Sequence, residues 1–386
     1  MKKKKTAKAH KQRIVIPDCK RFTGYKPCFP GTRCYQECAD PLPIGKRILI
    51  VNLDAMGNVL VTTSILPALK RKYPRSHISW ITLKNARPLL ENNPLLDRVY
   101  VWEPEAWMVL GQIQFDLVLN VDKSARSCAF VGTLRAGRKL GFGLNKEGVI
   151  IPLNKEANEN YLLGLDDHLK FRVNQKTVAQ ILCETFLLRY ANDEYVLKLS
   201  DDEQEFCRQY LNEHRIRDGE VVVGLNTGCS DLYPNKKLRV DQHVQLIGLL
   251  GGIPGIRIVL VGGPEDTKRN AEIVRQVNTP VLSTPTDEGV RKGLCYVNIC
   301  DLVISGDSFG MHAAIGLQKH VIAWFGVTSP AEINVFERGE KLAPEGLHCS
   351  PCWKRECPYN LECIDMVDLK GIAGIVRKFA ESRRLS

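Results

Sequence analysis

The sequence predicts an α/β protein built from two Rossmann-like, doubly wound domains that face each other across a cleft. Three observations support this fold class. Short apolar runs of strand length alternate with segments of helical pattern, as in parallel sheets whose strands are joined by helices. The pattern lapses in a polar, less regular region at about 140–215 and restarts at Glu220. The chain has 386 residues, which is more than one hydrophobic core usually serves.

The first domain is expected over residues 46–215. Four buried-strand patterns open it, at 47–51, 77–83, 97–102 and 115–121. A helix is expected from Val59 to about Tyr73, because Pro74 cannot continue a helix. One further amphipathic helix is expected at about 175–190.

The second domain is expected over residues 216–386. Its strand patterns lie at 221–225, 257–261, 302–304 and 321–325, and a helix is expected at 240–250. Polar loops follow these strands at 226–230, 262–265, 306–310 and 326–330. Because open parallel sheets bind ligands at the carboxyl ends of their strands, we expect these loops to line the cleft.

Residues 1–45 form an appendage, in which a basic tail with a lysine run at 2–5 precedes a segment rich in cysteine, proline and glycine. There is no secretory signal, because the basic N-terminus lacks an apolar core. No apolar stretch approaches the roughly 18 residues that a membrane span needs. We therefore expect a cytoplasmic protein, with peripheral contact to an anionic membrane at its inner face as the remaining option.

The chain carries a formal net charge of +11, which suits anionic partners such as nucleic acid, membrane surfaces or phosphorylated substrates. The basic residues do not gather into one patch interleaved with aromatic residues, so we expect no nucleic-acid partner. The hydrophobic content of 44% is that of an ordinary globular protein.

Eight of the 14 cysteines form two clusters. The N-terminal cluster, C-x8-C-x5-C-x3-C, consists of Cys19, Cys28, Cys34 and Cys38. The C-terminal cluster, C-x2-C-x4-C-x5-C, consists of Cys349, Cys352, Cys357 and Cys363. Four thiolates in a short, turn-rich segment can hold a structural zinc or iron ion, with no coordination position left open for catalysis. The alternative is a set of reduced, partly buried thiols. Disulfides are not expected in a cytosolic chain.

The loop at 306–310 carries Asp307 and Ser308 at the predicted start of a helix, with His312 one turn later. The free N–H groups of a helix N-terminus favour anions, so a phosphorylated or nucleotide ligand fits this loop. Helix capping by Asp307 or Ser308 is the alternative interpretation.

Four sequence blocks occur in a fixed order. They are ILIVNLDAMGNVLVTTSILPALKRKYP (48–74), GLNTGCS…NKKL (224–238), VLVGGPED (259–266) and SGDSFGMHAA…FGVTSP (305–330). In order and spacing they resemble glycosyltransferase family 9, the ADP-heptose:lipopolysaccharide heptosyltransferases. The ending HCSPCWKRECP (348–358) also resembles the C-terminal portion of that family. The N-terminal cysteine cluster lies outside the common family core.

The resemblance implies a glycosyltransferase of the B fold type (GT-B), with the acceptor on the first domain and the sugar nucleotide on the second. It also implies an inverting transfer of heptose from ADP-heptose to a lipopolysaccharide inner-core sugar, with no catalytic metal or other cofactor. Two alternatives remain within this chemistry. One is transfer from another nucleotide sugar to a protein or other glycan. The other is a catalytically impaired, sugar-nucleotide-binding homologue.

The donor site that the resemblance implies lies in the second domain. Its donor-binding residues are Cys229, Ser230, Glu265, Asp307, Ser308 and His312. Ser308 would bind the diphosphate, and Asp307 and Glu265 would bind sugar or ribose hydroxyls. Lys236, or its neighbour Lys237, would neutralise the leaving diphosphate. The alternatives are a helix-terminal charge for Glu265 and a solvated pair for the two lysines.

The acceptor side departs from the family pattern at one position. The family usually reads G-D-V where this chain reads Gly57-Asn58-Val59, and the missing Asp is the family's presumed general base. An amide cannot take the acceptor's proton, so Asn58 would have a positioning role. Asp54 or Asp122 would then serve as base, or the chain is a slow or inactive variant. Asp122, Lys123 and Arg126 are the expected acceptor-binding residues, the two cations holding acceptor carboxylates or phosphates, with surface salt bridges as the alternative.

Overall fold

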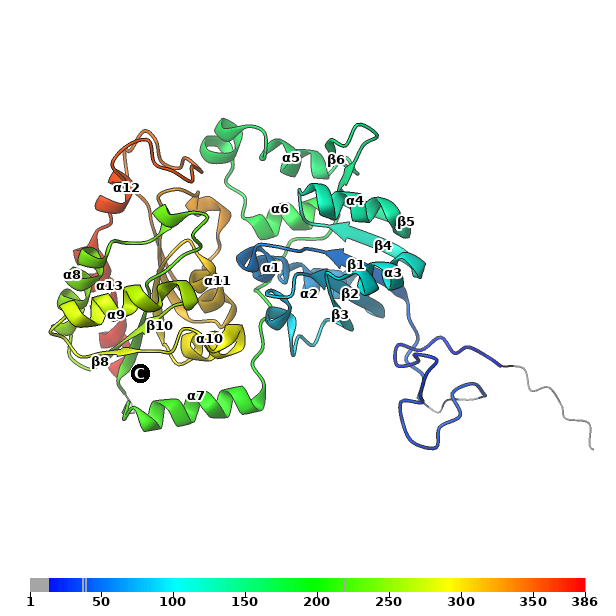
Figure 1. Ribbon diagram of the computed structural model, residues 1–386, viewed down its shortest axis with the longest axis horizontal. Coiled ribbons are helices and arrows are strands. Elements are labelled where there is room, and N and C mark those ends of the chain that lie inside the picture. Colours follow the sequence, from blue (N-terminus) through cyan, green and yellow to red (C-terminus); the bar gives the residue numbers. More distant parts are fainter. Residues whose placement is uncertain (1–13, 37, 39, 218, 386) are drawn as a thin grey trace, which may run out of the picture.

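The computed structural model describes residues 14–36, 38, 40–217 and 219–385. It shows two α/β units side by side, with the N-terminal extension standing apart from both (Figure 1). The lysine run at 2–5 lies outside the described residues.

The first unit is a six-stranded sheet with the strand order β3-β2-β1-β4-β5-β6. Its strands are β1 (Lys46–Val51), β2 (Ser76–Thr82), β3 (Arg98–Val101), β4 (Gln114–Asn120), β5 (Arg135–Leu144) and β6 (Ile150–Pro152). β1 pairs in parallel with β2 and β4, and the edge strand β6 is antiparallel to β5.

The second unit is also a six-stranded sheet, with the order β12-β11-β10-β7-β8-β9. Its strands are β7 (Val221–Asn226), β8 (Ile256–Val261), β9 (Val281–Ser283), β10 (Leu302–Gly306), β11 (His320–Trp324) and β12 (Gly339–Leu342). All its neighbouring strands are parallel.

Numbered within its own unit, each sheet has the strand order 3-2-1-4-5-6, which is that of a doubly wound Rossmann-like fold, and this confirms the predicted fold class. The winding reverses between β1 and β4 in the first unit and between β7 and β10 in the second. Ligands of open parallel sheets bind at such switch points. The loops that follow these four strands are therefore the first place to look for a site.

Helices cover both sheets (Figure 1). In the first unit they are α1 (Met56–Thr62), α2 (Ile65–Lys72), α3 (Pro104–Gln112), α4 (Ala125–Thr133), α5 (Ala157–Leu162) and α6 (Val178–Thr185). The others are α7 (Asp201–Glu213), α8 (Val240–Gly251), α9 (Thr267–Gln276), α10 (Gly289–Asn298), α11 (Phe309–Gly316), α12 (Glu362–Asp365) and α13 (Leu369–Leu385). No helix in the described ranges combines the length and the apolar character needed to cross a bilayer.

The expected single helix at 59–73 is wrong in one respect, because it is two helices, α1 and α2, separated at Thr63 and Ser64. Pro67 explains the break. It has no N–H to donate to the carbonyl of Thr63, and its ring collides with that carbonyl in a continuous helix.

The region at 140–215, expected to be polar and less regular, also contains elements that were not predicted: the end of β5, β6, α5 and α7. β5 begins with the charged, exposed residues Arg135 and Arg138 and is buried only from Leu140 onward, so its sequence lacks a strand pattern. The edge strand β12 (GEKL) is missed for a related reason, whereas β9 (VLS) is too short to show a strand pattern. An edge strand has one neighbour and tolerates polar residues.

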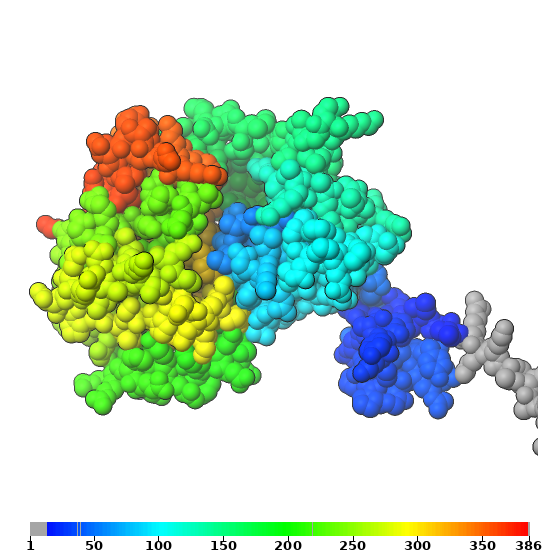
Figure 2. Space-filling view, viewed as in Figure 1, coloured from blue at the N-terminus to red at the C-terminus, as the bar shows by residue number. Residues whose placement is uncertain are grey.

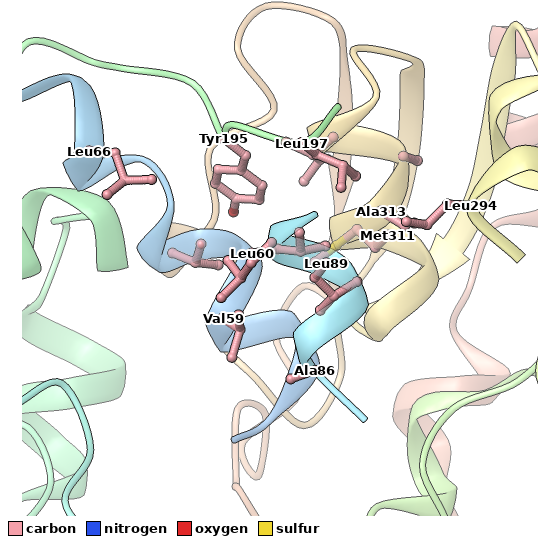
Figure 3. Packing of buried hydrophobic residues seen from close by; sticks show 14 of the residues in the cluster. Val59, Leu60, Leu66, Ala86, Leu89, Tyr195, Leu197, Leu294, Met311 and Ala313 are labelled. Atoms are coloured by element: carbon pink, nitrogen blue, oxygen red, sulfur yellow. The ribbon is translucent and has the colours of Figure 1, made fainter. Parts of the chain in front are cut away.

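A hydrophobic core shared by the two units closes part of the boundary between them. One cluster joins Leu60 of α1 and Leu89 of the short 3-10 helix η1 (Arg87–Leu90) to Met311 of α11. Tyr195 and Leu197, from the segment that connects the units, complete it, as Figure 3 shows. This apolar contact holds the carboxyl ends of the two sheets together.

The N-terminal extension attaches to the first unit mainly through one lysine. The Lys20 amine donates a hydrogen bond to the carbonyl of Ser76 and pairs with Asp97 at 3.0 Å. Figure 2 shows the extension protruding from the body of the molecule, away from the second unit.

Met311→Ala should lower the free energy of unfolding by about 2–5 kcal/mol, because it leaves a cavity in the core that both units share. Urea denaturation measures this loss. Met108, on α3, is 67% exposed, so Met108→Ala should stay within about 0.5 kcal/mol of the parent protein. Equal losses in the two variants would contradict the shared core.

Candidate functional site

The loops after β1 and β10 meet at the boundary between the units. A methyl group placed on Gly57, at the start of α1, would lie only 2.6 Å from Cδ2 of the His312 ring on α11. Because glycine has no side chain, the two helix starts can approach this closely. The structure thereby places Asn58, which is exposed, beside the predicted donor loop.

Asp307 is the centre of a buried charge network in that loop. Its carboxylate accepts a hydrogen bond from the Lys236 amine at 2.9 Å, and the His312 Nε2 atom lies 3.8 Å from its other oxygen. Burial works against the ionised form, but the charge of Lys236 outweighs it and keeps the pKa of Asp307 below its usual value. A bound diphosphate would compete with Asp307 for Lys236.

His312 is neutral at physiological pH in this setting. Burial lowers its pKa to about 4, although the neighbouring Asp307 opposes that shift. The ring stacks on Tyr195, whose hydroxyl lies 3.5 Å from His312 Nδ1. His312 thus joins the donor loop to the segment that connects the two units.

Ser308 is at the N-cap position of α11, but its side chain makes no capping hydrogen bond to the helix. Its hydroxyl instead accepts a hydrogen bond from the Asn226 amide at 2.9 Å, and that amide also contacts Ser305. Gly310 is required here, because a Cβ atom would lie 2.5 Å from the Asn226 side chain. The first N–H groups of α11 therefore lack a side-chain cap from Ser308.

The loop after β7 is held by short local contacts. The Cys229 thiol donates to the carbonyl of Tyr233 at 3.1 Å, and burial raises its pKa. The Ser230 hydroxyl accepts from the backbone N–H of Leu232 at 3.2 Å. The structure therefore places both predicted donor residues in one turn, immediately before Lys236.

Glu265 is exposed, whereas the next residue, Asp266, is buried. The Asp266 carboxylate accepts a hydrogen bond from the N–H of Gly263 at 2.9 Å, and burial raises its pKa. A Cβ atom on Gly228 would collide with it at 2.0 Å. Asp266, which the sequence reading did not single out, thus ties the β8 loop to the β7 loop.

Of the predicted acceptor residues, Asp122 and Lys123 lie on the loop after β4, and Arg126 lies in the first turn of α4. Arg126 is ion-paired to Asp54 at 2.6 Å. Asp122 is buried and accepts two 2.6 Å hydrogen bonds, from the Asn52 amide and the Leu53 backbone N–H. Burial raises its pKa to about 7, even though both bonds favour the ionised carboxylate. Asp122 thus fixes the β1 loop.

Lys123 follows Asp122 in the loop after β4. Its amine donates to the carbonyl of Asn160 at 2.7 Å and lies 5.3 Å from the centre of the Phe142 ring. Burial, and then the charge of Lys170, lower its pKa to about 8. The amine is therefore mostly charged at neutral pH.

Four residues at the boundary of the units were missed by sequence reasoning: Lys170, Tyr233, Glu332 and Trp353. The Lys170 amine lies 3.9 Å from the centre of the Trp353 ring and 3.7 Å from the Glu332 carboxylate. Lys236 lies 5.4 Å from the same ring, which also contacts Tyr233. These residues come from distant parts of the chain, and only the tertiary structure places the Trp353 ring between Lys170 and Lys236.

All 14 cysteines are free thiols. The four of the C-terminal cluster line one cavity of about 390 Å³, together with residues 167–168 and 171–172 of the first unit. Burial and the other three thiols raise the pKa of Cys363 to about 11. Within the described part of the chain, no three His, Cys, Asp or Glu side chains are arranged to hold a metal ion, so both predicted metal sites stay predictions.

Comparisons with known proteins give one consistent picture. The sequence model described as glycosyltransferase family 9 (heptosyltransferase) matches residues 105–362. The lipopolysaccharide core heptosyltransferase OpsX of Haemophilus influenzae is 23% identical over 299 residues, which cover 74% of this chain and 80% of that protein.

Two solved structures share the fold. A glycosyl transferase family 9 protein from Veillonella parvula superposes with a TM-score of 0.66 at 18% identity, over 89% of this chain and 98% of the other. The ADP-heptose LPS heptosyltransferase II of E. coli superposes with a TM-score of 0.64 at 16% identity, over 87% of this chain and 99% of the other.

Gly57→Ala should lower the free energy of unfolding by about 1–3 kcal/mol, because the added methyl must push α1 away from the His312 ring. Urea denaturation provides the measurement. Gly111, on α3, has open space around its Cα atom, so Gly111→Ala should stabilise by up to about 1 kcal/mol. A neutral or stabilising Gly57→Ala would show that the two loops do not pack as described.

Proposed function

The chain belongs to glycosyltransferase family 9, and from this premise we propose that it moves a heptose or related sugar from ADP-heptose to a lipopolysaccharide inner-core acceptor. The transfer inverts the anomeric carbon and uses no catalytic metal. The observation that carries the proposal is the meeting of both switch points, with Lys236 and the start of α11 on one side and the β1 and β4 loops on the other.

The donor would occupy the second unit. Its diphosphate would accept hydrogen bonds from Ser308 and from the free N–H groups at the start of α11, where the helix dipole favours an anion. Lys236 would leave Asp307 and neutralise the charge that develops on the departing diphosphate. Cys229, Ser230 and Glu265 would contact the remaining donor oxygens.

The acceptor would occupy the first unit. Lys123 and Arg126 would hold its anionic groups, with Arg126 keeping Asp54 as a second partner, because a guanidinium carries five N–H donors. An acceptor hydroxyl would attack the anomeric carbon as the bond to the diphosphate breaks. Asn58, at the start of α1, would position this hydroxyl through its amide.

The presence of Asn58 favours one second candidate, a sugar-nucleotide-binding homologue with little activity. Incubation with a panel of nucleotide sugars and deacylated inner-core acceptors separates the two. We expect ADP-heptose to raise the melting temperature and the acceptor mass to grow by one heptose. Binding without transfer to any acceptor would support the impaired homologue, and absence of binding to every nucleotide sugar would overturn both.

The extension supports peripheral contact with an anionic membrane, where a lipopolysaccharide precursor would lie. Tyr25 and Phe29 are exposed, at 84% and 57%, and lie beside Lys26 and Arg21 respectively. Aromatic rings with adjacent cations suit the interface of an anionic bilayer.

Lys236→Met should lower kcat by about 10²–10³-fold, because it removes the cation that faces the leaving diphosphate. Steady-state transfer kinetics measure the change. Lys237→Met is the matched control. Lys237 lies 4.0 Å from the exposed Asp231, and such a loose pair contributes little, so kcat should stay within about threefold. If the two variants lose activity equally, Lys236 has no special role.

We also propose that the C-terminal cysteine cluster holds a structural zinc or iron ion, because its four thiols line one cavity. Elemental analysis of the purified full chain should then find metal, and Cys352→Ser should lose it. Cys128→Ser, which changes a thiol outside both clusters, should retain the metal. A metal-free parent protein with normal stability would contradict the proposal.

A further inference from the structure

The chemistry proposed above lacks an evident base. The acceptor hydroxyl must lose its proton as it attacks, and the Asn58 amide cannot accept one. A carboxylate elsewhere at the boundary of the units has to take this proton, if the chain transfers sugar at an ordinary rate.

Three of the nearby carboxylates are already tightly held. Asp54 forms a 2.6 Å ion pair with Arg126. Asp122 accepts two 2.6 Å hydrogen bonds that anchor the β1 loop. Asp307 is bonded to Lys236 at 2.9 Å, and it lies in the loop expected to hold the donor rather than beside the acceptor.

Glu332 is held much more loosely. It ends the short 3-10 helix η5 (Pro330–Glu332), on the loop that follows β11. Its side chain is only 14% exposed, yet its nearest cation, Lys170, is 3.7 Å away. The backbone of the turn is firmly anchored, because the Lys341 amine donates to the carbonyls of Pro330 and Ile333 at 2.8 Å each.

Charged groups from both units face Glu332. Lys170 comes from the π-helical turn at Leu169–Val173 and Lys123 from the loop after β4, both in the first unit. Asp307 comes from the loop after β10 in the second unit. The Glu332 carboxylate therefore lies between the side expected to hold the acceptor and the loop expected to hold the donor.

On this geometry we propose that Glu332 is the general base of the transfer reaction, an inference that rests on the function proposed above. The acceptor hydroxyl gives its proton to a Glu332 carboxylate oxygen as its own oxygen bonds to the anomeric carbon. The bond from that carbon to the diphosphate breaks, and the diphosphate leaves with the electron pair. Lys170 is a positioning residue that orients the carboxylate.

The electrostatic environment suits this role. Burial raises the pKa of Glu332, the Lys170 charge opposes the rise, and the Asp307 charge adds to it. A carboxylate with a raised pKa is a better proton acceptor.

Glu332→Gln tests the proposal because it keeps the shape of the side chain and removes its basicity. We expect kcat to fall by about 10²–10⁴-fold. The shift in melting temperature caused by ADP-heptose should be unchanged. Glu345→Gln, an exposed carboxylate beyond β12, is the matched control and should keep parent activity.

Two further variants separate catalysis from a structural role. In Lys170→Met the loss of the positive charge raises the pKa of Glu332, so the acid limb of the kcat–pH profile should move to higher pH. Asn58→Asp, added to Glu332→Gln, supplies a carboxylate at the family position and should recover at least about tenfold of the lost rate.

The outcomes are distinct. Parent-like kcat in Glu332→Gln, or loss of donor binding in that variant, would overturn Glu332 as the base while leaving the proposed function intact. An acid limb that Lys170→Met does not move would also overturn it. Absence of transfer by the unsubstituted chain would overturn the proposed function, and this inference with it.

Discussion

The contact between Gly57 and the His312 ring is the constraint on which the rest of the site depends. It brings the starts of α1 and α11 together, and the apolar cluster around Leu60 and Met311 holds them there. Both helices follow a switch-point strand, so this one contact sets the residues of two separate sheets face to face. A side chain at position 57 would push α1 away from the His312 ring and so disturb a candidate site that draws residues from both units.

Two cations of the candidate site are already paired with carboxylates when no ligand is bound. Lys236 pairs with Asp307, and Arg126 pairs with Asp54. Each pair satisfies its charges without a ligand, and the Lys236–Asp307 pair would open when a diphosphate competes for the lysine. The Lys236–Asp307 pair keeps two buried charges compensated between turnovers, which an isolated buried ion could not do without a large desolvation cost, whereas Arg126 and Asp54 are exposed.

The strands at the switch points were predictable from the sequence, and the elements that were not predicted have physical causes. The strands flanking the switch points are fully buried, so their sequences are apolar runs that any strand pattern detects. The exposed start of β5 and the edge strand β12 carry polar residues and leave no such pattern, and β9 has only three residues. Pro67 divides a continuous helical pattern into the two helices α1 and α2.

By itself the sequence determined the doubly wound fold and the family, and it predicted a donor loop around Asp307, because these depend on periodicity and on short contiguous motifs. Only the tertiary structure decided which carboxylates are tightly hydrogen-bonded and which are loosely paired. Asp122 became a buried anchor for the β1 loop, whereas Glu332 was left loosely paired between Lys170 and Asp307. The partners of each carboxylate come from strands far apart in the chain, and burial and charge at such a point arise only when the sheets meet.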